Sequence, residues 1–154
     1  MPGPTDQEQL MLELINETRL DPMANAARYI SSYSPLTSPD SNIQSALTAF
    51  KVDGAILQAA YQALVPVGPL AWNDALGTAA QNHSAKMIEA QQQSHQLPGE
   101  PNLGQRLIDA GYNYTFAGEN IYAYSYSILY GHAGFMVDWG GSNGGMQDPP
   151  GHRD

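Results

Sequence analysis

Three side chains of this sequence have the chemistry of a metal site: His95, Glu119 and His152. Both histidines stand in polar segments close to proline and glycine, where rigid loops commonly carry function. Two imidazoles and a carboxylate suit zinc with one coordination position left open to water. Their separations, 24 residues from 95 to 119 and 33 residues from 119 to 152, match no local metal motif. Spacing alone therefore favours three polar side chains in unrelated loops over a shared site.

Glu119 lies in a short stretch where we expect a loop to become a strand. Gly118 before it permits a tight or positive-φ path, and Ile121 and Tyr122 after it favour β structure. A carboxylate held in such a place is costly to bury unless it is paired, hydrogen-bonded or bound to a metal. The sequence therefore predicts that Glu119 points into a space lined by partners.

Helices must position these side chains, and capping residues indicate where the helices begin and end. Thr5 and Glu8 form a capping box, Pro22 suits a first helical position, and Asn73 is a good N-cap. Gly111 is a usual residue after a helix. The expected helices cover residues 6–20, 22–30, 42–64 with a break at 53–54, 74 to about 93, 103–110 and 127–139. Residues 31–41 and 140–154 are rich in turn formers and are expected to be loops.

The other two histidines are expected to be packing residues. His83 falls on the apolar stripe of the helix expected over 74–93, and His132 lies on an apolar helical face further along the chain. On a continuous helix, His83 and His95 would be about 18 Å apart along the axis. They could share a metal only if that helix ended early.

The amino-acid composition indicates the class of protein and limits the partners that it could bind. A chain of 154 residues with 42% apolar and 14% charged residues predicts one globular domain. Six basic against 15 acidic side chains give a net charge of -9. This balance excludes nucleic acid and anionic membranes as natural partners.

Two further classes are excluded by what the sequence contains. There is no cysteine, so disulfides and thiolate metal sites do not occur. No apolar run is long enough to span a bilayer. The first residues lack the basic and apolar regions of a signal peptide.

Six short motifs follow one another in a characteristic order. They are Asn82-His83-Ser84, Ser94-His95, Arg106-Leu107 with Ala110-Gly111-Tyr112, Gly118-Glu119-Asn120-Ile121, Asp138-Trp139-Gly140 and Pro150-Gly151-His152-Arg153. In this order and spacing the chain resembles a bacterial member of the CAP superfamily. That superfamily groups cysteine-rich secretory proteins, antigen 5 and pathogenesis-related proteins. The resemblance runs from about Glu8 to the last residue, and residues 14–22 resemble the first helix of the bacterial extracellular branch.

The resemblance implies an α+β fold, an α-β-α sandwich with a small antiparallel sheet between helical layers. It also implies a cleft lined by two histidines and two glutamates. His95, Glu119 and His152 match three of these four positions. The fourth falls near Ser142, so the second carboxylate is missing, and Asp138 is a candidate substitute.

The resemblance also implies how the chain is organised and where the protein acts. We expect a single domain over 1–154, with a helical part at about 5–64 and a cleft-bearing part at about 70–154. Family members continue past the Gly-His-Arg motif into further strands, so the chain is expected to be truncated there. An extracellular, secreted protein is implied.

We favour a binding domain whose cleft takes a divalent metal such as zinc, a small apolar molecule or a protein partner. The alternatives are a hydrolase and a structural cell-surface module with a vestigial cleft. A hydrolase would use a zinc-bound water, or Ser84 or Ser142 activated by histidine, but the sequence has no Gly-x-Ser-x-Gly elbow. An enzyme is therefore not favoured, and the ligand and the oligomeric state stay open.

Overall fold

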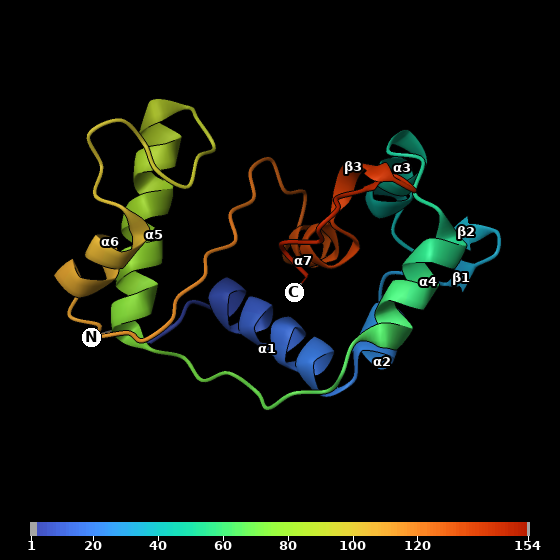
Figure 1. Ribbon diagram of the computed structural model, residues 1–154, viewed down its shortest axis with the longest axis horizontal. Helices are drawn as coiled ribbons and strands as arrows, with labels where there is room; N and C mark the ends of the chain where they lie inside the picture. The colour runs from blue at the N-terminus through green and yellow to red at the C-terminus, as the bar shows by residue number, and fades with distance from the viewer. Residues whose placement is uncertain (1–2, 154) are drawn as a thin grey trace. The chain divides into compact units, whose positions relative to one another are not determined.

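The structure is a computed structural model that describes residues 3–153. Seven helices and three strands are found there (Figure 1). The helices are α1 Asp6–Leu20, α2 Pro22–Ala26, α3 Ser41–Ala49, α4 Gly54–Ala63, α5 Asp74–Ala90, α6 Leu103–Asp109 and α7 Ile128–Val137; the strands are β1 Ser32–Tyr33, β2 Leu36–Thr37 and β3 Trp139–Asn143. Helix predominates over a small antiparallel sheet of β1 and β2, so the predicted α+β class is confirmed.

The contacts within the chain divide it into two compact units. The first unit is built on Ala71–Tyr124, and the second on Gln7–Leu70 with the residues from Ser125 on. The sequence instead suggested a division between residues 64 and 70. The expectation of one domain over 1–154 stays a prediction, and each unit is described below by itself.

Aspartates and asparagines begin the helices as their capping chemistry predicts. Asp21 accepts a hydrogen bond from Ala24 N at 3.0 Å ahead of α2, whose first residue is Pro22. Asp53 accepts from two amides of the first turn of α4. A side-chain oxygen at this place satisfies amides that have no partner inside the helix. The expected break before Gly54 is therefore found: α3 ends at Ala49, Lys51 has a φ of 56°, and α4 begins at Gly54 with Asp53 as its cap.

The second unit is built around α7. Ser127 caps this helix, and seven of its ten residues are buried, which is the pattern of a core helix. The surrounding core consists mainly of Leu, Ile and Tyr side chains: Leu14, Tyr29, Ile43, Leu47, Leu57 and Tyr61. Burial of these side chains supplies most of the stability of this unit.

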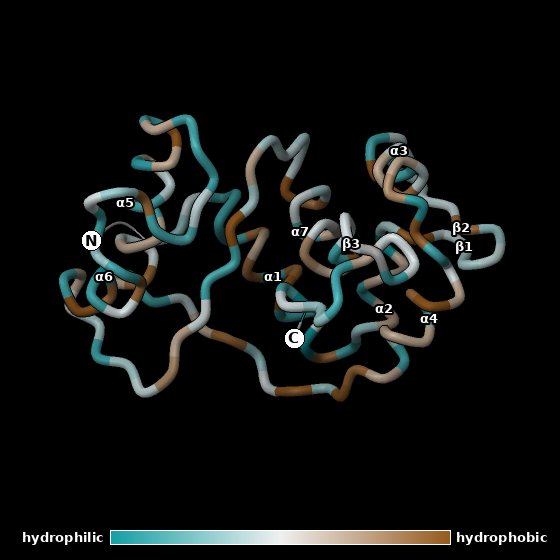
Figure 2. Tube along the Cα trace, turned by 45° about the horizontal axis from the view of Figure 1, so that its top comes forward, coloured by the Kyte–Doolittle hydropathy of each residue, from teal (hydrophilic) through white to brown (hydrophobic). Residues whose placement is uncertain are grey.

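The segment that follows α4 is attached to α1 by hydrogen bonds rather than by burial. Figure 2 shows several hydrophobic residues along it, and Val65 and Val67 are exposed. Asn16 of α1 donates to Leu70 O at 2.9 Å and accepts from Leu70 N at 2.6 Å. Arg19 O accepts from Val67 N at 2.7 Å. These bonds hold the segment extended.

A two-strand hairpin, β1 and β2, lies inside the loop expected over 31–41. Ser31 N donates to Thr37 O at 2.8 Å, and the two side-chain hydroxyls are 2.9 Å apart. Strands of two residues are too short to show an alternating pattern, which is why the sequence reading missed them.

The strand expected after Glu119 is not formed. Residues 120–123 have no partner strand among residues 3–153, and Ile121 O instead accepts from the Gln93 side chain at 3.1 Å. Tyr124 then adopts a φ of 61°, which ends the extended path, whereas Gly118 has no positive φ. A strand requires a ladder as well as β propensity, and the described chain supplies none here.

The first unit packs α6 beside α5 (Figure 1). Asn73 caps α5 as expected, but the helix ends at Ala90, because Gln91 turns into the left-handed region with a φ of 51°. The chain therefore reverses before His95 rather than carrying it further along the helix axis. This early end decides which side chains meet at the candidate site.

His132 is buried as expected in the second unit, but as part of a polar cluster. Its Nε2 lies 2.9 Å from Asn25 Oδ1 and 3.1 Å from Thr18 Oγ1, which ties α7 to α2 and α1. Burial lowers its pKa to about 4, with Glu17 opposing the shift and Arg28 adding to it. The neutral imidazole is therefore the form that the fold accepts.

Stability should fall on mild acidification because of His132. The unfolded chain takes up this proton near pH 6.5 and the folded chain only near pH 4, so stability is lost as pH falls between these values. Urea unfolding at pH 7 and pH 5 should differ by about 2 kcal/mol. His132→Gln should remove most of this difference. An equal acid-dependent loss in the variant would contradict the assignment.

Candidate functional site

The first unit brings His95, Arg106 and Glu119 into one hydrogen-bonded group. His95 Nδ1 lies 3.0 Å from Glu119 Oε2. Arg106 donates from Nη1 to Glu119 Oε1 at 2.8 Å and from Nη2 to Oε2 at 3.1 Å. Arg106 Nη2 also donates to the main-chain oxygen of His95 at 2.9 Å. Arg106 therefore holds the Glu119 carboxylate through both oxygens and holds the backbone of His95 directly.

The three side chains differ in their exposure to solvent. The Arg106 side chain is 7% exposed and that of Glu119 is 14% exposed, whereas 60% of the His95 side chain is exposed. The buried pair of Arg106 and Glu119 therefore holds the imidazole of His95 in place at the surface, where solvent can reach it.

Local structure explains how these residues meet. Asn102 caps α6, and Arg106 lies in the last turn of that short helix. The reversal after Ala90 brings the segment with His95 alongside, and Glu119 follows on the irregular stretch after α6. The group is thus built from one helix and two loops.

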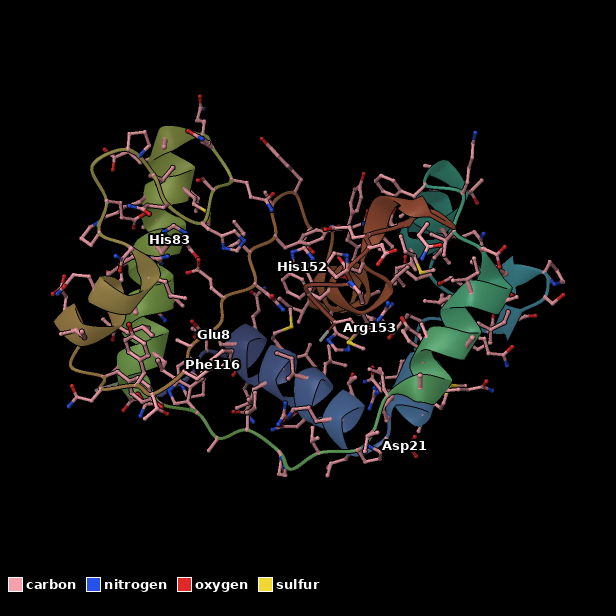
Figure 3. The ribbon with its side chains drawn as sticks, viewed as in Figure 1. Glu8, Asp21, His83, Phe116, His152 and Arg153 are labelled. Carbon is pink, nitrogen blue, oxygen red and sulfur yellow. The ribbon has the colours of Figure 1, made fainter. Side chains whose placement is uncertain are left out.

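A second buried pair, His83 and Glu100, lies next to this group. Figure 3 labels His83 on α5. Its Nδ1 is 3.0 Å from Glu100 Oε1 and its Nε2 is 3.0 Å from Ser94 O, with both side chains of the pair only 2% exposed. His83 Nε2 is also 3.9 Å from Glu119 Oε2. The two pairs are therefore neighbours in one polar cluster.

The two nitrogens of the His83 ring face different partners. A carbonyl oxygen only accepts, so Nε2 donates to Ser94. Burial alone would raise the pKa of Glu100, but the hydrogen bonds from His83 and Leu97 N outweigh it and lower that pKa. The Glu100 carboxylate faces Nδ1 of the same ring at 3.0 Å, so both ring nitrogens of His83 have an oxygen partner.

Glu119 is ionised for a similar reason. Burial raises its pKa, but the hydrogen bonds from Arg106 and His95 outweigh burial and place the pKa below its usual value. Arg106 thus faces Glu119, and Glu100 has His83 at 3.0 Å and Lys86 Nζ at 3.6 Å. Each buried carboxylate therefore has a partner, as a protein interior requires.

A groove of about 730 Å³ lies on the same unit. It is lined by Ser84, Met87 and Ile88 of α5, by Gln91–Gln93 and by Tyr122–Tyr124. None of these side chains is charged. The groove is therefore suited to a neutral ligand that combines apolar and hydrogen-bonding groups.

The second unit holds another histidine–carboxylate pair. His152 Nδ1 lies 2.6 Å from Asp138 Oδ1, and His152 N donates to Asp138 Oδ2 at 3.2 Å. Asp138 caps α7 in the left-handed conformation and is buried. Figure 3 shows His152 and Arg153 beside α7, and Arg153 donates to Met136 O at 3.1 Å. The end of the described chain is thus attached to α7.

A model of the cysteine-rich secretory protein family, called CAP, matches residues 12–143. The chain belongs to the CAP family. The recognition made from the six motifs is confirmed. The bacterial origin and the truncation stay predictions. The comparison with curated proteins and the comparison with solved structures each gave no match. None of the helices within residues 3–153 could cross a membrane.

Two of the three residues proposed as ligands in this CAP domain lie together. His95 and Glu119 are in contact within the first unit, whereas His152 belongs to the second. The convergence of all three therefore stays a prediction. The side chain of Ser142, the other residue considered at the fourth position, lies outside the described residues.

The cluster contains three residues that sequence reasoning did not assign to the site: His83, Glu100 and Arg106. His83 was expected to be a half-buried packing residue because it lies on an apolar helical stripe. Its only signal was its place in the motif Asn82-His83-Ser84. Arg106 likewise stood in a recognised motif without a role, and Glu100 had no signal at all.

Whether a metal fits the first unit depends on which of its side-chain atoms could still act as ligands. Among residues 3–153 no group of three or more His, Cys, Asp or Glu side chains is arranged to hold an ion. Glu119 already accepts three hydrogen bonds, whereas the bond at Nδ1 of His95 leaves Nε2 as its lone-pair nitrogen. Among these residues of the first unit, His95 Nε2 is thus the nitrogen that could act as a donor.

The buried His83–Glu100 pair should be strongly coupled. His83→Gln or Glu100→Gln removes one partner of a buried pair and leaves the other, which typically costs about 3 to 5 kcal/mol. We expect about the lower figure for His83→Gln, because Lys86 Nζ lies 3.6 Å from the remaining Glu100 carboxylate. Urea unfolding of both single variants and the double variant measures the coupling.

The double variant should lose clearly less than the two single losses added together. Strictly additive losses would show that the two side chains do not form an ion pair. Glu89→Gln, an exposed change on the same helix, is the matched control and should have little effect.

Proposed function

We propose that this CAP domain is a secreted binding domain with a site for a divalent cation such as zinc, formed by His95, Glu119 and His152. The observation that carries the proposal is the bond between His95 Nδ1 and Glu119, made by an imidazole that is 60% exposed. Proteins of this family are typically extracellular, which supports secretion.

The bond to Glu119 prepares His95 to bind a cation. An ionised carboxylate accepts, so the proton of the neutral ring stays on Nδ1 and the lone pair on Nε2. Histidine ligands of metals usually have such a carboxylate or carbonyl behind them, which fixes the tautomer and makes the nitrogen more basic. His95 therefore has the surroundings of a metal ligand.

His152 has a comparable partner in Asp138. The 2.6 Å contact from its Nδ1 to Asp138 Oδ1 again sets a carboxylate behind an imidazole. Asp138 thus supports His152 in the proposal, and it is the carboxylate that the sequence reading named as a substitute. Bound zinc would act as a Lewis acid for whatever ligand occupies its open position.

The hydrogen bonds described for the histidines of residues 3–153 do not include one to Ser84, one of the two serines considered as a nucleophile. The uncharged groove beside Tyr122–Tyr124 favours a second candidate, a small neutral ligand bound on the first unit.

Zinc titration by calorimetry at neutral pH tests the proposal. The native chain should bind one zinc, and His95→Ala and His152→Ala should each weaken binding by at least tenfold. Affinity should also fall on acidification, because each histidine must be neutral to bind metal. Glu89→Gln is an exposed control and should bind as the native chain does.

The variants also separate the alternatives. If the native chain bound no zinc, or if His95→Ala bound it equally well, the cation site would be refuted and the groove would remain the candidate for binding.

A further inference from the structure

We propose that Arg106 is a positioning residue of the cation site: it keeps Glu119 out of the coordination shell and makes Glu119 act through His95. The inference rests on the proposed function and specifies how that site is built. The side chain of Arg106 is only 7% exposed. Its effect on a bound cation must therefore pass through His95 and Glu119, the two residues that it holds.

Arg106 holds His95 at both ends. Its Nη2 donates to the main-chain oxygen of His95 at 2.9 Å, which fixes the backbone. Its two terminal nitrogens also hold the carboxylate that bonds the His95 ring, at 2.8 and 3.1 Å. One guanidinium therefore fixes both the position of the residue and the direction of its ring. The planar fork of arginine permits this, and a lysine has no equivalent.

The same contacts make Glu119 a poor direct ligand. A carboxylate has about four acceptor sites, and Arg106 and His95 occupy three of those of Glu119. A divalent cation bound directly to a Glu119 oxygen would also lie close to a buried guanidinium charge. Two positive charges at that separation in a poorly solvated place repel strongly.

The hold on the His95 ring follows from these contacts. With Arg106 in place, both oxygens of Glu119 are held, and Oε2 lies 3.0 Å from His95 Nδ1. Without Arg106, the carboxylate loses the two bonds that orient it and is able to turn away from the ring. The contact at Nδ1 is then weakened, and the other tautomer of the ring becomes accessible.

If Glu119 is instead a direct ligand of the metal, the expected change in zinc affinity of Arg106→Met has the opposite direction. If Glu119 were a direct ligand, Arg106 would compete with the metal, and removing its charge would tighten zinc binding. If Arg106 positions His95, its removal should weaken binding by about 10- to 100-fold, as is usual for residues behind a histidine ligand. Zinc titration of Arg106→Met decides between the two.

A second readout needs no metal. In protein labelled with ¹⁵N in histidine, the ring shifts of His95, assigned with His95→Gln, report its tautomer. The native chain should show His95 with its proton on Nδ1, and Arg106→Met should show a mixture of tautomers. Arg28→Met, which removes an exposed arginine of the second unit, should leave the signal unchanged.

Arg106→Lys is a second variant for the case that Arg106→Met does not fold. It keeps the charge but not the two-point hold, so the chain should remain folded with an intermediate tautomer mixture and intermediate zinc affinity. Unchanged His95 shifts in both Arg106 variants, or tighter zinc binding in Arg106→Met, would overturn the proposal. If the native chain bound no zinc while the tautomer responded as expected, the cation site would fail but the positioning role would stand.

Discussion

The ion pair between Arg106 and Glu119 is the interaction on which the candidate site depends. Arg106 is buried in α6, and its bonds reach a loop on either side, to His95 O and to the Glu119 carboxylate. A buried arginine leaves its partners little freedom, because each unmade bond would expose a charge to an apolar interior. The pair therefore contributes more to geometry than to net stability.

The neighbouring pair of His83 and Glu100 extends this constraint. Glu100 also accepts from Leu97 N at 3.3 Å, which fixes the turn after His95. His83 donates to Ser94 O and so fixes the turn before it. His95 is thus exposed, yet the chain on both sides of it is bonded to the buried side chains of His83 and Glu100. This explains how a surface imidazole can be held without a regular strand beneath it.

Local chemistry made much of the fold predictable. Asn73 was predicted as a helix cap because a capping oxygen acts within three residues of itself, and Pro22 was predicted as a first helical residue. The CAP family was recognisable from the order of short motifs, which survives where no single motif is decisive. The helix expected over 127–139 was found as α7, and the structure shows Ser127 to be its cap.

What depends on distant residues could not be predicted. Ile121 has β propensity, but whether it forms a strand depends on a ladder from elsewhere, and the described chain has none. His83 lies on an apolar stripe, yet its role was decided by Glu100, seventeen positions away in the sequence. The end of α5 at Ala90 was missed for a local reason. Gln91 adopts the left-handed conformation that ends the helix, and glutamine is not a residue type that favours this conformation.

Diffraction at the zinc absorption edge from crystals of the zinc-loaded protein tests the account most directly. We expect one anomalous peak at about 2.0–2.1 Å from His95 Nε2, the usual zinc–nitrogen distance. Glu119 should still be bonded to Arg106 and to His95 Nδ1 in that structure. Zinc bound directly to a Glu119 oxygen with Arg106 displaced, or bound away from His95 altogether, would contradict the account.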